Sequence, residues 1–432
     1  MKDFHKIFLA ILLIVVGGLT NNVHAQNEID FVPGEIVVKL KLAADLGAIA
    51  AQYDLSPQPL DQFGSRPIYR LRILGNTPPP ELAEQLLNDS NSRIIYAEPN
   101  YFAQTPEGSG LSWSVGLSWS VGLSWSVGDS WSMSATGTTS NLWFRDKIKM
   151  SQAHQYTRGN GVTVAILDTG IDRTHPVLAP QIVGGFDFVD FDNDPSEVGV
   201  YGVDPGYGHG THVAGLVAAT APQAKILPVR VLNENGIGNI WVLAEALKYA
   251  ATVDPDGNPA TDDKVEVINL SFATRRRTHL LSEIISAVTC EDGDDTDDNF
   301  CFAEDRKGIA VIAAAGNSGY EVREYPAAEE VPGSLAVAAT DLFDRRAAFS
   351  TFGGWVEVGA PGANIRSTVP GGRYAVWSGS SMAAPLASGK AALIRSRYPD
   401  FKAADVTNFI VSKSDSISGH VQKRINLFEA VK

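Results

Sequence analysis

The chain has 432 residues, a formal charge of −14 and an apolar fraction of 44%. Its length favours one large domain with a smaller one beside it, and its apolar content excludes wholesale disorder. Nucleic-acid binding needs Lys and Arg clustered against the phosphates, so an acidic chain of this composition is predicted to bind no nucleic acid.

Residues 1–25 have the pattern of a signal peptide. Two lysines precede an apolar run at 7–16, and Val-His-Ala follows as a small-residue cleavage pattern. The run is too short to span a bilayer comfortably, although a buried N-terminal helix would also fit it. We predict cleavage after Ala25 and a secreted or periplasmic protein with no membrane association after that cut.

A small α+β unit is predicted next, over residues 34–104. The segment GEIVVKLKL predicts a strand, PPPELAEQLLND a helix that opens after prolines, and SRIIYAEPNYFA a second strand. We therefore expect a compact block of about 70 residues, with helix packed on sheet.

Residues 105–140 carry a repeat. The unit LSWSVG occurs three times from Leu111 and then decays to DSWSMS. Because the period is even, the Leu, Trp and Val residues share one parity, and in an extended chain they would lie on one face. The segment is either a linker lengthened by duplication or a strand-like segment that docks on a surface or self-associates.

From residue 141 to 432 the chain alternates between strand and helix patterns. Short, β-branched apolar runs such as GVTVAILDTG, AKILPVRVL and GIAVIAAAGN are typical of parallel strands buried on both faces. The segments NIWVLAEALKYAAT and SMAAPLASGKAALIRSRYP predict helices. We expect an α/β domain with an open, mainly parallel sheet and helices on both faces, whose site lies beyond the C-terminal strand ends.

Several polar residues fall at strand or helix ends. Asp168 ends the run VTVAIL, Asn317 follows another strand, and Ser381 opens a helix among small residues. His209 lies in GYGHGTHVAG, with His212 three residues later. A carboxylate, a histidine, a serine and an amide are what acyl transfer through a serine nucleophile requires. A zinc site is the alternative, but the metallopeptidase helix pattern has its histidines four apart with a Glu between them.

These motifs together resemble a known family. AILDTGID, GHGTHVAG, AAAGNSG and GSSMAAP, in that order, resemble the signature motifs of the subtilisin-like serine peptidases, over the whole α/β domain. The resemblance implies the subtilisin-like fold, with Asp168 orienting His209 as the general base and Ser381 as the nucleophile. Asn317 would donate to the oxyanion beside the Ser381 backbone N–H, and His212 would be structural.

Residues 26–104 resemble the family's inhibitory propeptide, which assists folding and blocks the cleft until it is cut. GEIVVKL and IIYAEPNYFA carry that likeness. It implies that the partners are protein or peptide substrates and the protein's own propeptide, which acts as an intramolecular inhibitor of a monomer. The Trp repeat would then lie between propeptide and enzyme, where maturation cuts are expected.

The resemblance also assigns substrate-binding residues. In this family the substrate lies as an extended strand between two edge segments, which VLNENGIGNI and INLSFAT resemble. Ser271 and Gly316 are predicted to contact substrate, although Ala273 and Thr274 stand where the family usually has two glycines. Glu324 falls at the base of the pocket for the residue before the cut, where a buried carboxylate would favour Arg or Lys. The alternative is a solvated Glu on a loop.

Calcium is predicted as a structural ion, whereas catalysis is expected to require no cofactor. Oxygen-rich acidic loops suit this hard cation. Such loops occur at 187–195, 254–263 and 290–301. We expect the first to bind an ion, through Asp190, Asp192 and Asp194.

The complete prediction is a secreted serine endopeptidase made as a zymogen. Cys290 and Cys301 bracket a short loop, and in an exported protein they are predicted to form a disulfide rather than remain two free thiols. One alternative is a transpeptidase or cyclase on the same fold, in which an amine replaces water. The other is a non-catalytic binding protein that keeps the fold.

Overall fold

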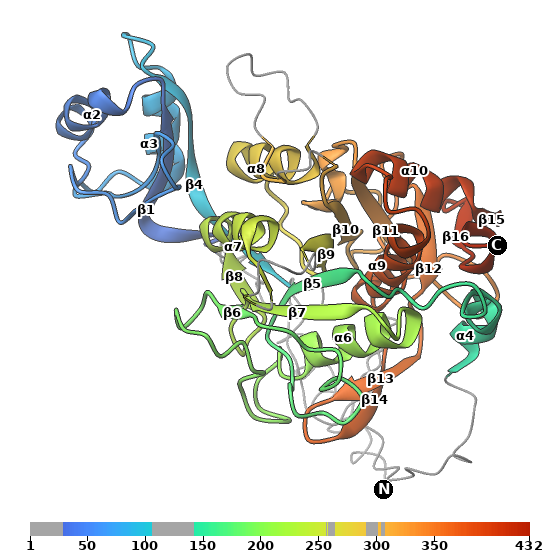
Figure 1. The fold of residues 1–432 in the computed structure, drawn as a ribbon. Coiled ribbons are helices and arrows are strands. Elements are labelled where there is room, and N and C mark those ends of the chain that lie inside the picture. The colour runs from blue at the N-terminus through green and yellow to red at the C-terminus, as the bar shows by residue number, and fades with distance from the viewer. Residues whose placement is uncertain (1–28, 106–141, 256, 258–263, 291–300, 304–306) are drawn as a thin grey trace, which may run out of the picture.

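The computed structural model describes residues 29–105, 142–255, 257, 264–290, 301–303 and 307–432 (Figure 1). The predicted signal peptide and all of the Trp repeat beyond Thr105 therefore lie outside the described residues. The described chain forms a small N-terminal unit, blue to cyan in Figure 1, and a large unit that contains the rest.

The small unit is an antiparallel sheet with helices packed on it. Its elements are β1 (Phe31–Leu40), η1 (Ala43–Asp45), α2 (Leu46–Gln52), β2 (Asp61–Gln62), β3 (Ile68–Arg72), α3 (Pro79–Leu87) and β4 (Ile94–Gln104). β1 pairs with β3 on one side and with β4 on the other. Alternate β1 residues, Ile36, Val38 and Leu40, are fully buried in a core that α2 and α3 complete. The predicted α+β unit is confirmed.

A nine-stranded sheet forms the centre of the large unit. Its strands are β5 (Thr163–Asp168), β6 (Phe186–Asp187), β7 (Lys225–Arg230), β9 (Val265–Leu270), β10 (Ala310–Ala314), β11 (Ser334–Thr340), β12 (Val358–Pro361), β15 (Ser414–Ser416) and β16 (Lys423–Ile425). Their order is β15-β16-β12-β11-β10-β9-β5-β7-β6. Only the β15–β16 pair is antiparallel among these described neighbours. The predicted open, mainly parallel sheet is confirmed.

Helices cover both faces of this sheet because its strands are apolar on both sides. In β5, Val164 and Ile166 belong to one hydrophobic core, and Ala165 and Leu167 belong to the other. The first core includes residues of α6 (His209–Thr220), α9 (Ser380–Arg397) and α10 (Ala403–Ser412), and the second includes residues of α7 (Ile240–Thr252) and α8 (His279–Thr289). The remaining elements are α4 (Trp143–Lys147), α5 (Met150–Ala153), β8 (Ile237–Asn239), η3 (Ala327–Glu329), η4 (Phe428–Ala430) and the hairpin β13 (Ile365–Val369) with β14 (Arg373–Trp377).

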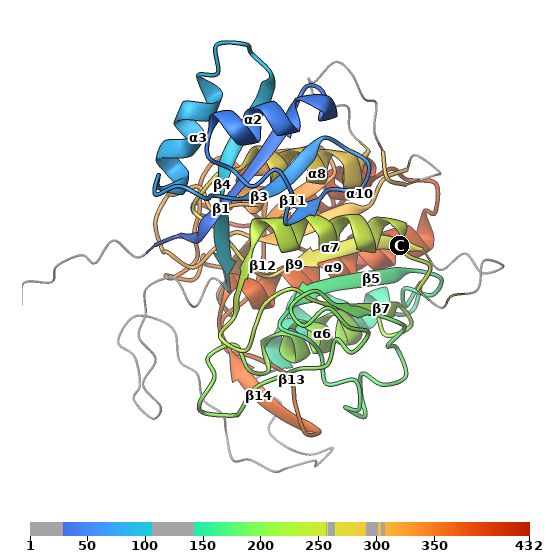
Figure 2. The same ribbon diagram turned by 90° about the vertical axis from the view of Figure 1, so that its left-hand side faces the viewer.

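The two units share one strand. β4 leaves the small sheet, and its last residues, Phe102 to Gln104, pair antiparallel with β8 of the large unit. On its other side, Gln104 exchanges two backbone hydrogen bonds with Ala273, at 3.0 and 2.8 Å. Both ribbon views show β4 running from the small unit into the large one (Figures 1 and 2). The small unit is therefore anchored by a strand that both units use.

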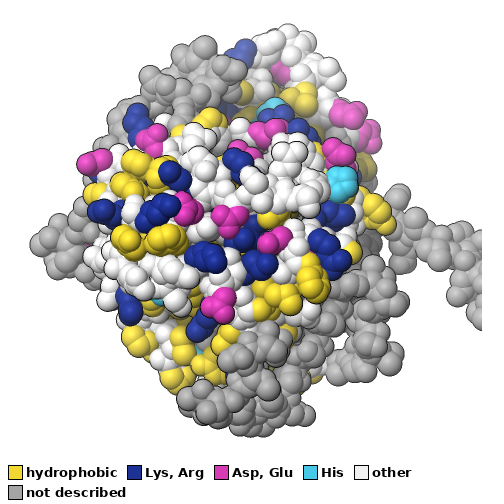
Figure 3. Space-filling view, turned by 90° about the vertical axis from the view of Figure 1, so that its right-hand side faces the viewer, with side chains coloured by type: hydrophobic (Ala, Val, Ile, Leu, Met, Phe, Trp, Pro, Cys, Tyr) yellow, Lys and Arg dark blue, Asp and Glu magenta, His cyan; other side chains and the backbone are white. Residues whose placement is uncertain are grey.

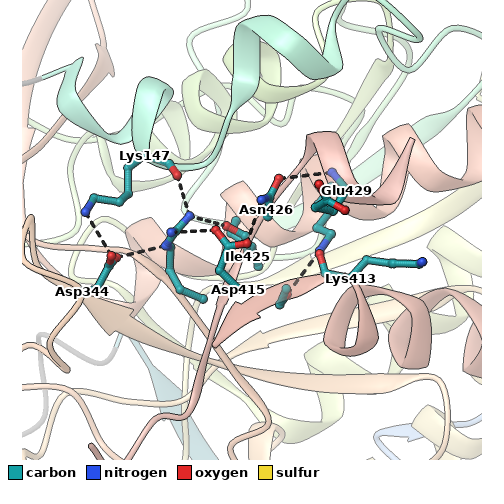
Figure 4. Close-up of polar contacts among 10 residues, drawn as sticks. Lys147, Asp344, Lys413, Asp415, Ile425, Asn426 and Glu429 are labelled. Atoms are coloured by element: carbon teal, nitrogen blue, oxygen red, sulfur yellow. Dashed lines mark hydrogen bonds and ion pairs between the residues drawn. The ribbon is translucent and has the colours of Figure 1, made fainter. Parts of the chain in front are cut away.

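A buried arginine, Arg424, joins the beginning and the end of the large unit. Its partners Lys147, Asp344, Asp415 and Ile425 are labelled in Figure 4. Arg424 donates from Nε to Asp344 at 3.0 Å and from Nη2 to Asp415 at 2.9 Å. Its Nη1 donates to the carbonyl oxygens of Lys147 and Ile425, at 2.5 and 3.1 Å. The Lys147 ammonium also pairs with Asp344, at 3.0 Å. These contacts tie α4 to β16.

The described part of the surface shown in Figure 3 carries no large patch of one charge. On this face, basic, acidic and apolar side chains are interspersed. None of the helices in the described ranges is both long and apolar enough to cross a membrane. Cys290, at the end of α8, is joined to Cys301 by a disulfide.

Candidate active site

Asp168 and His209 meet at the C-terminal end of the sheet. Asp168 is the last residue of β5, and His209 is the first residue of α6. Asp168 Oδ1 lies 2.7 Å from His209 Nδ1 and accepts the backbone N–H of Thr169 at 2.8 Å. A carboxylate can only accept, so the imidazole carries its proton on Nδ1, which leaves Nε2 as the basic nitrogen. Both side chains are buried.

Glycines allow this strand end and this helix start to approach each other. A Cβ on Gly210 would lie 2.1 Å from the carbonyl oxygen of Gly170 and 3.1 Å from the Cβ of Asp168. Gly208, the N-cap of α6, has φ of +88°, in the left-handed region that favours glycine. Gly210 is therefore required by the close approach of α6 to the end of β5, and Gly208 by the left-handed turn that begins α6.

Ser381 opens the helix that packs beside α6. It is the second residue of α9, after the N-cap Gly379, and it is fully buried. Its Oγ donates to the carbonyl oxygen of Ser271 at 3.4 Å, and Ser271 Oγ donates back to the Ser381 carbonyl at 3.2 Å. A Cβ on Gly389 would lie 2.4 Å from the Cβ of Thr220, so a glycine lets α9 lie against α6. The helix that begins with the predicted nucleophile therefore packs against the helix that carries His209.

Asn317 is held by the backbone at the start of α9. Its Oδ1 accepts the backbone N–H of Ser380 at 2.8 Å, and Ser380 Oγ accepts the N–H of Gly316 at 3.1 Å. Because the amide oxygen accepts this bond, the NH2 group is the part of the Asn317 side chain that can donate. A donor fixed before the reaction in this manner suits a developing oxyanion.

His212 lies one turn after His209 in a different environment. It is fully buried, and its ring stacks on Trp377 with 4.5 Å between centroids and 11° between planes. Burial lowers its pKa to about 3, with a smaller contribution from His209, so the ring is neutral. Within the described ranges, no group of three His, Cys, Asp or Glu side chains is placed to hold a metal ion. The arrangement favours a packing role for His212.

Glu324 lies beside the predicted substrate contacts. Its side chain is 3% exposed, and a Cβ on Gly316 would lie 1.6 Å from Glu324 Oε2. The next residue, Tyr325, exchanges two backbone hydrogen bonds with Thr274, each 2.8 Å long. The carboxylate is therefore buried between the loop that carries Asn317 and the edge segment that follows Ser271, and it is not a solvated loop side chain.

The end of β4 lies between the two segments predicted to hold substrate. Gln104 pairs with Ala273 on one side, and Thr105 N donates to the Gly236 carbonyl oxygen on the other, at 2.9 Å. Ala103, which precedes Gln104 in β4, is fully buried. The alanine at position 273 therefore keeps the backbone pairing that a glycine there would offer.

The first acidic loop does not gather its three predicted ligands. Asp190 pairs with Arg230 at 2.5 Å, Asp194 pairs with Arg173 at 3.4 Å, and Asp192 accepts the backbone N–H of Asp194 at 2.8 Å. As arranged, these carboxylates alone do not fit a calcium ion. The other two acidic stretches lie largely outside the described residues, so calcium stays a prediction.

Two buried carboxylates, those of Glu98 and Glu197, were not predicted as functional residues from the sequence. Glu98 of β4 accepts the backbone N–H groups of His279 and Leu280 at the start of α8, at 2.7 and 3.0 Å. Burial raises the pKa of Glu98 to about 7, against the lowering effect of those two bonds. An acidic residue inside an apolar strand was the available signal. The second carboxylate, Glu197, lies in an irregular loop that offered none.

The chain matches two family models. Residues 159–426 match the subtilase family, and residues 19–100 match a fervidolysin N-terminal prodomain. Thermitase from Thermoactinomyces vulgaris is 37% identical over 66% of this chain and 94% of its own length. A thermophilic serine proteinase from Bacillus sp. (strain AK1) is 38% identical over 65% of this chain, which spans 64% of that relative.

Two solved structures show the same architecture. A cold-adapted subtilisin-like serine proteinase is 28% identical, with a TM-score of 0.52 over 62% of this chain and 90% of that one. Fervidolysin from Fervidobacterium pennivorans is 21% identical, with a TM-score of 0.67 over 94% of this chain and 61% of that one. The second likeness covers both the small and the large unit.

Proposed function

Because the chain belongs to the subtilase family, we propose that it is an exported serine endopeptidase, made as a zymogen, with Asp168, His209 and Ser381 as its catalytic triad. The observation that carries the proposal is the 2.7 Å contact between Asp168 and His209 Nδ1 beside the helix that Ser381 opens. Export rests on the signal-peptide pattern at the N-terminus.

Each residue has a defined step in this mechanism. Ser381 Oγ attacks the scissile carbonyl carbon while His209 Nε2 takes the hydroxyl proton, and Asp168 stabilises the imidazolium through Nδ1–H. The new oxyanion is met by the Asn317 NH2 group and the backbone N–H of Ser381. The C–N bond then breaks, His209 returns the proton to the leaving amine, and water hydrolyses the acyl-enzyme by the same route.

The small unit acts as the inhibitor of this site in our proposal. β4 supports it, because Gln104 and Thr105 make the backbone hydrogen bonds that an extended substrate would make. A tethered strand in that position competes with substrate at high effective concentration. The enzyme is released when the chain is cut and β4 leaves.

We also propose that the residue before the cut is preferentially Arg or Lys. Glu324 supports this, because a buried carboxylate beside Gly316 would pair with a cationic side chain by a charge-assisted hydrogen bond. The preference sets a limit on self-processing, since residues 105–144 contain no Lys or Arg and the first is Arg145. A cut within the Trp repeat would have to use a less favoured residue.

The activity is tested by intact-mass analysis of the matured protein after treatment with a fluorophosphonate. We expect one adduct on the wild type and none on the Ser381→Ala variant. A folded, propeptide-free protein that takes no adduct would refute the enzyme proposal and favour a binding protein. Product analysis with an added amine separates hydrolysis from transpeptidation.

The specificity is tested with two peptides that differ only in ending with Arg or Phe before the cut. We expect the wild type to prefer the Arg peptide by kcat/KM, and Glu324→Gln to lose at least about tenfold of that ratio. Glu330→Gln, which changes an exposed carboxylate on the same loop, is the matched control. An unchanged ratio in Glu324→Gln removes the specificity proposal and leaves the activity untouched.

A further inference from the structure

Glu197 makes three hydrogen bonds to the two segments that carry the catalytic pair. Its Oε1 accepts the hydroxyl of Thr169 at 2.7 Å. Its Oε2 accepts both the hydroxyl and the backbone N–H of Thr211, at 2.8 and 3.1 Å. Thr169 directly follows Asp168, and Thr211 is two residues after His209. One carboxylate therefore spans from the end of β5 to the first turn of α6.

The two threonine hydroxyls extend this bridge to the backbone. Thr169 Oγ1 accepts the N–H of Gly210 at 3.0 Å, and Thr211 Oγ1 accepts the N–H of Asp172 at 2.9 Å. Each hydroxyl thus donates a hydrogen bond to Glu197 and accepts one from a backbone N–H of the opposite segment. Only a side chain that accepts on both oxygens satisfies this pattern, which selects a carboxylate.

The loop that carries Glu197 is fixed to the same strand end. Glu197 N donates to the Ile171 carbonyl oxygen at 3.3 Å, and Ile171 N donates to Pro195 O at 3.1 Å. A Cβ on Gly170 would lie 2.6 Å from the Ser196 carbonyl oxygen, so no larger residue fits between loop and strand. The backbone therefore delivers Glu197 to one position behind the Asp168–His209 pair.

The charged groups around Glu197 are of both signs. Asp168, at the end of β5, acts on Glu197 directly. Tyr207, in the segment that enters α6, lies within range of both Glu197 and the cationic Arg373. Burial raises the pKa of Glu197 to about 7, the threonine hydrogen bonds lower it, and the charge of Asp168 raises it further.

We propose that Glu197 is a positioning residue that locks Asp168 and His209 at hydrogen-bonding distance by accepting from Thr169 and Thr211 together. This inference rests on the proposed peptidase activity and assigns to it a residue outside the triad. Among the described residues, the Glu197 side chain bonds to Thr169 and Thr211, so it acts through these two threonines and not on substrate. Its loss should lower kcat and leave KM nearly unchanged.

The test compares Glu197→Gln and Glu197→Asp with the wild type, all as matured full-length preparations whose active sites are counted by fluorophosphonate titration. Glu197→Gln keeps the size but replaces one accepting oxygen by a donor, so kcat per titrated site should fall about 10- to 100-fold. KM should stay within about twofold. Glu197→Asp keeps the charge but shortens the reach and should lose less.

The pH profile supplies a readout that a purely structural role would not move. Because burial raises the pKa of Glu197 to about 7, ionisation of Glu197 should contribute to the acid limb of kcat/KM in the wild type, and Glu197→Gln should lose that contribution. Glu197→Asp should keep the limb near that of the wild type. Asp204→Asn is the matched control, because its carboxylate lies in the same loop and, among the described residues, accepts the backbone N–H of Val200 at 2.7 Å.

Two outcomes overturn the proposal. One is a Glu197→Gln enzyme with wild-type kcat and acid limb per titrated site, even if its melting temperature falls. The other is an equal change in Asp204→Asn. If Glu197→Gln does not fold, wild-type kcat in Glu197→Asp has the same meaning. A wild type that takes no fluorophosphonate would instead refute the peptidase proposal, so the two failures are distinguishable.

Discussion

Asp168 and Arg424 are both buried charges in strands of the same sheet, but their surroundings differ. Arg424 has a partner for each of its three guanidinium nitrogens. The two carboxylates of Asp344 and Asp415, labelled in Figure 4, balance the charges of Arg424 and Lys147 together. Asp168 has Glu197 nearby as a second carboxylate, and its Oδ2 has no hydrogen-bond partner among the described residues. The positive charge on the other side of its hydrogen bond exists only while His209 is protonated.

The difference shows that the charge balance of a buried polar cluster depends on what the cluster does. A network that only holds the chain together is most stable when every charge is neutralised at all times. A site that must create a charge benefits from an excess of the opposite sign before that charge appears. The Arg424 cluster fits the first description, and the Asp168–His209 pair, in the mechanism proposed for it, fits the second.

The largest expected effect is a loss of kcat when the charge of Asp168 is removed. Asp168→Asn should lower kcat by on the order of 10⁴-fold, because an amide that donates to Nδ1 leaves the wrong imidazole nitrogen protonated. Asp415→Asn, which makes the same change in the Arg424 cluster, should leave kcat per titrated site unchanged. Single-turnover kinetics on both variants check this, and equal losses would mean that the two clusters are not different in kind.

The next effect breaks the structural side. Arg424→Met should lower the free energy of unfolding by about 3 kcal/mol, because Asp344 and Asp415 lose a shared partner in a partly buried site. Arg345→Met removes an exposed pair with Asp341 and should cost less than about 1 kcal/mol. Urea unfolding measures both. A kcat per titrated site that falls with Arg424→Met would contradict a purely structural role.

A smaller effect sharpens the comparison at the boundary between the two units. The pKa of Glu98 is raised to about 7 when β4 is docked, from 4.5 for the free group, so the docked state binds more protons between those values. Docking is therefore strongest below pH 4.5 and weakens as the pH rises through 7, by up to about 3 kcal/mol. Release of the site in the processed complex should be faster at pH 8 than at pH 5.

The measurement is the rate of fluorophosphonate labelling of that complex, divided at each pH by the rate for enzyme freed of its propeptide. Glu98→Gln retains a neutral acceptor for His279 N and Leu280 N, so it should remove most of the pH dependence. A steep pH dependence that persists in Glu98→Gln would assign the effect to other interface groups, such as Glu283 with Lys39 and Arg66.

The smallest expected effect concerns calcium. If an ion binds at one of the acidic stretches, excess EDTA should lower the melting temperature by a few degrees, because the ion stabilises only the folded state. Asp190 and Asp187 already share Arg230, so the first loop is partly neutralised without a metal. A melting temperature unmoved by EDTA would place this loop with the Arg424 cluster, as a charge network complete in itself.

The sequence predicted the elements that short-range patterns define. Continuous β-branched runs indicated the strands, and polar residues directly after them, such as Asp168 and Asn317, were placed at one end of the sheet. The spacing of Cys290 and Cys301 pointed to the disulfide that the structure contains. In each case the signal lies within a short stretch of the sequence.

The sequence did not predict contacts that only tertiary packing creates. Glu197 lies in a loop without periodicity, and its partners come from segments that precede and follow it in the chain. Glu98 was part of a predicted strand, but its partners are backbone N–H groups of a helix far along the sequence. Every residue except proline has a backbone N–H group, so the sequence pattern does not show which of these groups a buried carboxylate will bond.

The two segments that flank the end of β4 form hydrogen bonds to an extended backbone, as Ala273 does with Gln104. A segment inside a folded domain already uses its N–H and C=O groups in its own structure. Such a segment must first open over about five residues before it can lie in the cleft. The rate at which a folded protein is cut should therefore follow the free energy of its local opening. The enzyme would sample the local stability of its substrates before it distinguishes their side chains.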